Sequence, residues 1–148
     1  MNVHEWHRQG LEPAFATVEQ WINDQLGFVG AEDDACFATE IRPETARGGL
    51  AIRILVATDK GLFDMLWERP SDPAARNLYS RLYRWPEVTG ARLLATTRID
   101  PQTLIHGEPE WGIEMTEPEV ALPRVEEGLA LLDFWKACDK QLKKAVKG

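Results

Sequence analysis

Apolar and polar residues change their spacing along this chain, from a helical period near the start to alternation in the middle. Between residues 11 and 26 the apolar positions recur every three or four residues, as on one face of an amphipathic helix. Pro13 fits only the first turn of such a helix, and Gly27 is placed to end it. The pattern predicts a helix over 11–26, preceded by a flexible N-terminus over 1–10.

From residue 34 onward the apolar residues alternate with polar ones, and Pro- and Gly-rich segments separate the alternating runs. In "VATDKGLFDMLW", a loop over 58–61 sets Val56 opposite Phe63 and Ile54 opposite Met65, so that these side chains share one face. Gly61 then takes the positive φ that a side chain resists. The segment 34–116 is predicted to form antiparallel strands, including 77–85, which also fits a helix but whose tyrosines favour a strand.

The last part of the chain returns to a helical period and predicts a helix over 122–146. Pro123 fits its first turn, and lysines gather near its C-terminal end, where they favour the helix dipole. The apolar stripe of this helix is broad and must pack on the sheet: Val125, Leu129, Leu132, Trp135, Cys138 and Leu142. We therefore expect an α+β fold in one domain over 1–148. Its centre is a strongly bent antiparallel sheet or partial barrel, with an added N-terminal helix and a long C-terminal capping helix.

This order of elements, together with "LVATDKGLFDMLW", "YRWPEVTGARL" and "DFWKAC", resembles the pleckstrin-homology-like superfold and in particular the bacterial PH and GRAM-type domains. The family commonly has Arg where this chain has Gly61, and the N-terminal helix is an addition. The resemblance implies a domain that binds proteins, peptides or lipids, or that assembles with itself. Few members of the superfold are enzymes, and the inference is one of analogy between folds.

Composition and charge narrow the class of protein. The chain has 148 residues, 44% of them hydrophobic, and a formal net charge of −7 that repels nucleic acids. It has no apolar run of membrane-spanning length and no apolar signal sequence near its start, which predicts a cytoplasmic protein without stable membrane insertion. Cys36 and Cys138 are expected to be free thiols.

The charges are unevenly distributed along the sequence. Six arginines against two acidic residues lie within 69–98, whereas seven glutamates against one arginine lie within 108–127. Two interpretations remain open. The charges belong to solvated faces, or they form complementary patches that meet within the fold or between subunits.

Candidate chemistry is sparse. His4 and His7 flank a glutamate, but zinc hydrolases space their histidines four apart, so no metal site is expected. The glutamates over 108–119 come without a calcium-binding loop, and are expected to lie on a solvent-facing strand edge. The chain contains no nucleophile elbow, Walker-type loop or dinucleotide-binding glycine motif, so we expect neither catalysis nor a cofactor.

Six tryptophans are more than a domain of this size needs for its core. Trp21 lies off the main apolar stripe of its helix, and Trp85, next to Arg84 at a strand end, is expected at a rim. Exposed aromatic residues beside arginines are typical of contact surfaces, so the candidate interface residues are Trp6, Trp21, Arg84 and Trp85. The leading hypothesis is a non-catalytic protein-interaction or self-assembly module, whose partner is another protein or a second copy. The alternatives are a carrier or sensor of a small apolar ligand or lipid held within the bent sheet, and an enzyme with an unrecognised site.

Overall fold

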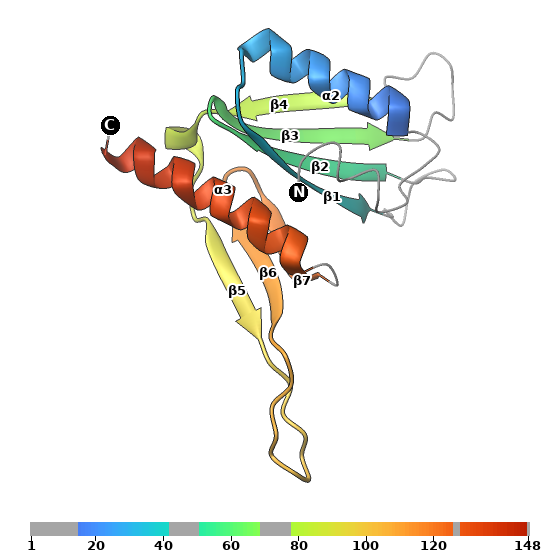
Figure 1. Ribbon diagram of the computed structural model, residues 1–148, viewed down its shortest axis with the longest axis vertical. Coiled ribbons are helices and arrows are strands. Elements are labelled where there is room, and N and C mark those ends of the chain that lie inside the picture. The colour runs from blue at the N-terminus through green and yellow to red at the C-terminus, as the bar shows by residue number, and fades with distance from the viewer. Residues whose placement is uncertain (1–14, 42–50, 69–77, 126–127, 148) are drawn as a thin grey trace.

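The computed structural model describes residues 15–41, 51–68, 78–125 and 128–147. These segments form two α-helices, a short 3-10 helix and two antiparallel sheets (Figure 1). In chain order the elements are α2 (Phe15–Val29), β1 (Asp34–Ile41), β2 (Ala51–Thr58), β3 (Gly61–Glu68), β4 (Leu78–Tyr83), η2 (Trp85–Glu87), β5 (Arg92–Thr96), β6 (Glu110–Met115), β7 (Val120–Val125) and α3 (Gly128–Lys147).

The α+β class and both flanking helices are confirmed, but the strands divide into two sheets. The first has the order β1-β2-β3-β4 and the second the order β5-β6-β7, with every neighbouring pair antiparallel. The two sheets are not closed into a barrel. η2 links the last strand of the first sheet to the second sheet, where Pro86 stands at the start of the helical turn.

The predicted register of the central hairpin is confirmed. Val56 pairs with Phe63 and Ile54 with Met65. The strands extend further into the turn than expected, because Thr58 pairs with Gly61 and only two residues lie between them. Gly61 has a φ of +153°, and a Cβ there would lie 2.5 Å from the carbonyl oxygen of Tyr83. A glycine is required at this position because β4 passes too close for a side chain.

The first sheet buries both of its faces. One face packs against α2 in a cluster that we call the α2-side core: Ile22, Leu26, Cys36, Ile54, Val56, Phe63 and Met65. The residues between them along the strands point the other way. They join α3 and the second sheet in the α3-side core: Phe37, Leu55, Ala57, Leu62, Tyr83, Trp85, Val88, Ile113, Met115, Val120, Leu131, Phe134 and Cys138. A two-sided sheet explains why these strands are apolar at consecutive positions.

Two predicted helix ends are wrong. α2 continues through Gly27 to Val29, and the turn after it contains Gly30 with a φ of +72° and its N–H bonded to the Gly27 carbonyl oxygen. The start expected at residue 11 lies outside the described residues, as do residues 1–10.

α3 begins at Gly128 rather than at 122, because residues 120–125 form a seventh strand beyond the predicted 34–116. Val120 pairs with Met115 and Leu122 with Ile113, so this segment continues the sheet. Val120 is buried, Ala121 is exposed and Leu122 is half-buried, which is the alternation of faces along a strand. Pro123 is therefore in β7 and not in a first helical turn. β7 is the edge of its sheet, where a proline without an N–H is tolerated.

Candidate functional site

The candidate interface residues are not gathered in one place. Trp85 belongs to the α3-side core with 6% of its surface exposed, so the exposed position expected for it at a rim is not found. Trp21 packs against the α2-side core and is half-buried. Arg84 is exposed, and Trp6 lies outside the described residues. The structure thus gives three of these residues different environments.

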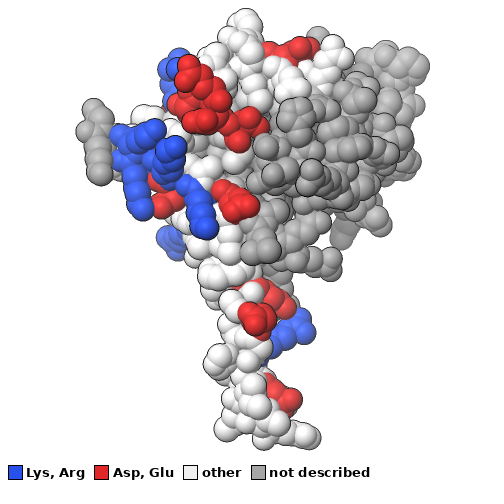
Figure 2. Space-filling model, in the orientation of Figure 1, with Lys and Arg blue, Asp and Glu red and all other residues white. Residues whose placement is uncertain are grey.

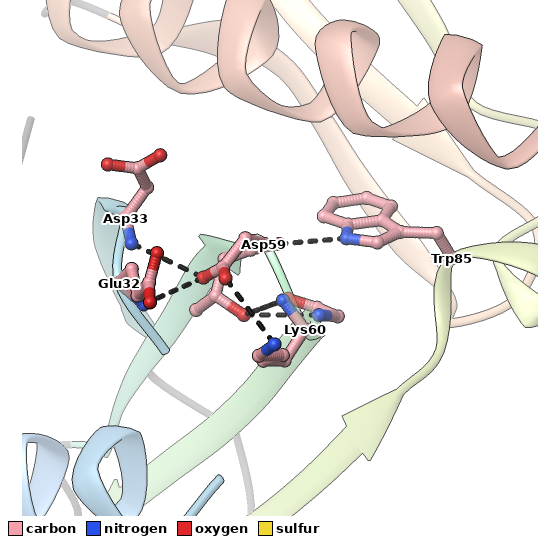
Figure 3. A network of polar contacts seen from close by, with 7 residues as sticks. Glu32, Asp33, Asp59, Lys60 and Trp85 are labelled. Atoms are coloured by element: carbon pink, nitrogen blue, oxygen red, sulfur yellow. Dashed lines mark hydrogen bonds and ion pairs between the residues drawn. The ribbon is translucent and has the colours of Figure 1, made fainter. Parts of the chain in front are cut away.

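Trp85 has a structural role in a network around the β2–β3 turn (Figure 3). Its indole N–H donates to the carbonyl oxygen of Thr58 at 2.8 Å. The Thr58 hydroxyl donates to the Gly61 carbonyl oxygen at 2.8 Å and accepts from the N–H groups of Lys60 and Gly61. A buried indole N–H normally finds such a partner, and here it ties η2 to the hairpin.

Asp59 extends this network to the start of β1. Its Oδ1 accepts from the backbone N–H groups of Glu32 at 2.9 Å and of Asp33 at 3.2 Å. Desolvation by itself raises the pKa of the Asp59 carboxyl, but these bonds outweigh it and the pKa lies below its ordinary value. The network holds three segments of backbone together.

The uneven charges of the sequence meet partly within the fold. β5 carries Arg92 opposite Glu114 of β6. Beyond the end of β5, the side chain of Arg98 lies 3.7 Å from that of Glu110. The arginine-rich and glutamate-rich segments thus lie beside each other in the second sheet.

The most prominent surface feature is a projection between β5 and β6, which we call the arm (residues 97–109). The arm extends away from the body of the molecule in Figure 1, and Figure 2 shows that its end is mostly uncharged surface. Ile99 and His106 face each other across it as an isolated bridge. Every residue of the arm is exposed, so it adds nothing to either core.

The tip of the arm is ordered by local hydrogen bonds. Asp100 Oδ1 accepts from the N–H groups of Gln102 at 2.8 Å and Thr103 at 3.1 Å. These bonds hold the pKa of the Asp100 carboxyl below its ordinary value. Two backbone hydrogen bonds close the loop. The N–H of Leu104 donates to the carbonyl oxygen of Asp100 at 2.9 Å, and the N–H of Asp100 donates to the carbonyl oxygen of Ile105 at 3.0 Å. The tip is therefore built in advance of any contact.

Three apolar side chains are displayed on this ordered tip. Ile99 is 62% exposed, Leu104 74% and Ile105 69%. Leu104 also has a φ of +61°, a left-handed conformation that favours glycine or asparagine over a bulky residue. A shallow, open hollow of about 570 Å³ lies at the tip, lined by Arg98, Ile99, Asp100, Thr103, Ile105, His106 and Gly107.

The prediction of antiparallel strands over 34–116 includes no projection among them, so it missed the arm. A signal was present. Asp100 and Pro101 begin a typical turn between two segments that the structure pairs as a hairpin. The apolar residues of the tip were not singled out, since an isolated exposed Ile or Leu is common.

Groups suited to chemistry are few in the described chain. Cys36 and Cys138 are free thiols, as predicted, and both are buried. Burial raises the pKa of the Cys36 thiol to about 12 and raises that of Cys138 as well, which makes both poor nucleophiles. No group of three or more potential metal ligands occurs among the described residues, and His4 and His7 lie outside them.

Over the same described part of the chain, neither helix has the length and apolar character needed to cross a membrane. No protein-family model matches this chain, and comparison with curated proteins and with solved structures gave no match.

Proposed function

We propose that this chain is a non-catalytic protein-interaction or self-assembly module, and that the tip of the arm is its contact element. One observation carries the proposal: Ile99, Leu104 and Ile105 are each more than 60% exposed on an ordered projection that packs against neither core. Contact surfaces of proteins are typically apolar at their centre and polar at their rim.

The cost of displaying these side chains supports the same proposal. A leucine in left-handed backbone costs about 1 kcal/mol relative to an unstrained position. Exposed on the tip, Leu104 recovers none of this by burial. A use outside the fold accounts for a side chain that the fold itself does not need.

The pleckstrin-homology-like resemblance is part of the proposal. Sheets of four and three antiparallel strands followed by a terminal helix that packs on both are in keeping with it. The superfold mostly serves binding, so the analogy supports an interaction module over an enzyme. The chain's net charge of −7 favours a protein partner over a nucleic acid.

A carrier of an apolar ligand within the first sheet has less support. Phe63 and Met65 of the first sheet are buried in the α2-side core together with Ile22 and Leu26 of α2. The hollow at the tip is open to solvent and has charged residues at its rim, unlike the enclosed apolar pockets that hold such ligands.

Photo-crosslinking tests the proposal directly. A photoreactive amino acid is incorporated in place of Leu104 in protein expressed in the native host cells. A second variant carries it in place of Lys144, an exposed position on α3, as the control. We expect protein adducts from position 104 and few from position 144. Equal labelling at the two positions, or none at 104, contradicts the arm as the contact element.

A further inference from the structure

The backbone of the arm leaves the N–H and C=O groups of Ile99 pointing outward on one edge and those of His106 on the other. The Ile99–His106 bridge is flanked by two bonds, from Gly107 N–H to the Arg98 carbonyl oxygen at 2.9 Å and from Asp100 N–H to the Ile105 carbonyl oxygen at 3.0 Å. In an antiparallel ladder, a residue between two such bonds directs its own N–H and C=O to the opposite edge. Within the described part of the chain, neither group of Ile99 has a backbone partner.

The three residues at this edge are complementary to themselves. Arg98, Ile99 and Asp100 give the order cation, apolar residue, anion. When two identical triplets run antiparallel about a twofold axis at Ile99, each Ile99 meets the other, and each Arg98 meets the Asp100 of the second copy. The N–H and C=O of each Ile99 then bond reciprocally to those of its counterpart.

We infer that the arms of two copies pair edge to edge through these triplets, so that the partner of the arm is a second copy of this chain. The inference rests on the proposed function and names the partner. Any extended peptide could add to a free strand edge, but the matched order of charge and apolar residue favours the chain's own arm.

The charges of the triplet are free to change partners. The Arg98 side chain is 76% exposed and its contact with Glu110 is long, at 3.7 Å, so little is lost when it turns to a second copy. Asp100 uses Oδ1 within the tip, and Oδ2 takes no part in those two bonds. The Asp100 carboxyl also has a side-chain hydrogen bond with Thr103, and as an exposed carboxylate with two oxygens it can accept a further bond from Arg98 of a second copy.

Two further features limit the pairing to a small contact. Pro101 follows the triplet and has no N–H, so the ladder cannot continue through it as a regular strand. The arm also projects away from the body of the molecule (Figure 1), so that the bodies of two copies joined through their arms lie apart. Because exposed charges are screened over about 8 Å at physiological ionic strength, the two net-negative bodies repel each other weakly at that separation.

Disulfide trapping tests this geometry with a matched pair of variants. In the paired arms the two Ile99 Cα atoms lie about 5.5 Å apart, within the range for a disulfide, whereas the two His106 residues are about three strand spacings, roughly 14 Å, apart. Cys36 and Cys138 are buried and can remain in place. We expect mild oxidation of Ile99→Cys to give mostly covalent dimer and that of His106→Cys only a background level.

A charge change tests the register. Arg98→Glu in the Ile99→Cys protein sets two anions opposite each other and should lower the yield of dimer severalfold, whereas Lys144→Glu, with the same change in charge on α3, should leave it unchanged. Each variant is checked for an unchanged melting temperature, so that a loss of fold is not taken for a loss of pairing.

The outcomes separate this inference from the proposed function. Equal yields from Ile99→Cys and His106→Cys, or no dimer from either, overturn edge pairing. Dimer from Leu104→Cys but not from Ile99→Cys overturns it too, while leaving the tip as a contact element. Adducts of a different protein at position 104, without Ile99→Cys dimer, refute the second copy as partner and retain the proposed function.

Discussion

The indole N–H of Trp85 donates to the carbonyl oxygen of Thr58 at 2.8 Å, and this bond joins the link between the two sheets to the turn of the β2–β3 hairpin. The bond is buried. Breaking it leaves the Thr58 carbonyl oxygen without this partner, in surroundings where water does not replace it.

We expect Trp85→Phe to lower the free energy of unfolding by about 1–3 kcal/mol, the usual cost of an unsatisfied buried polar group. Trp21→Phe, at a half-buried tryptophan of α2, serves as the control and should cost less. Urea unfolding followed by circular dichroism measures both. Equal losses would show that the bond to Thr58 contributes nothing beyond the packing of the ring.

The Asp59 carboxylate should make stability depend on pH. Its pKa in the folded protein is lower than in the unfolded chain, so its contribution is fully present above the unfolded pKa of about 3.9 and is lost as the pH falls through the folded value. Asp59→Asn does not titrate. The difference in free energy of unfolding between wild type and this variant should therefore be largest near neutral pH. It should shrink progressively as the pH falls below about 4.

Chemical denaturation at a series of pH values, with and without added salt, measures this difference. Glu32 and Asp33 donate through their backbone, and such bonds persist in salt, whereas the 3.8 Å contact of Lys60 with Asp59 is screened. A difference that disappears in high salt would assign the effect to Lys60 instead.

Two glycines of the described chain should respond oppositely to alanine. Gly61→Ala brings a Cβ to 2.5 Å from the Tyr83 carbonyl oxygen, and backbone cannot move aside as a flexible side chain can. We expect a loss of about 2 kcal/mol or more. Gly27→Ala lies in α2 with open space around it and should gain about 0.5–1 kcal/mol from helix propensity. Thermal unfolding of both variants checks the contrast, and a neutral Gly61→Ala would contradict the close approach of β4.

The two cysteines should report separately on the two faces of the first sheet. Cys36 lies in the α2-side core and Cys138 in the α3-side core, and burial suppresses the reactivity of both thiols. Ile22→Ala removes most of a fully buried side chain from the α2-side core. We expect this change to lower the free energy of unfolding by about 2–5 kcal/mol.

Alkylation followed by mass spectrometry, with single-cysteine variants to assign the sites, measures this. We expect Ile22→Ala to accelerate labelling of Cys36 more than that of Cys138, because α2 can open without disturbing α3. The same acceleration at both sites would mean that the two cores open only together.

The central hairpin illustrates how much of the fold the sequence predicts. Val56 faces Phe63 because only that register keeps the large apolar side chains on one face, and the rule acts between neighbouring strands. The end of α2 and the start of α3 were predicted less well. Gly27 disfavours a helix, yet α2 continues through it because its neighbours pack on the sheet. Pro123 disfavours a strand, yet it is tolerated in β7 because β7 is the edge of its sheet.

The candidate site was the least predictable part. Trp85 and Trp21 were both candidate interface residues, yet Trp85 is part of the α3-side core and Trp21 packs half-buried against the α2-side core. Ile99, Leu104 and Ile105 have unremarkable sequence signals, and became notable because a hairpin carries them away from the body. Burial depends on which distant segments meet, and no local pattern contains that information.

The sequence by itself determined the α+β class and the register of the central hairpin, since these follow from side-chain spacing over a few residues. The tertiary structure decided that the strands separate into two sheets, that the first sheet is covered on both faces, and that residues 97–109 project as an arm. The physical reason is that solvent exposure is a property of the whole packed chain, because a side chain is buried only when other segments cover it.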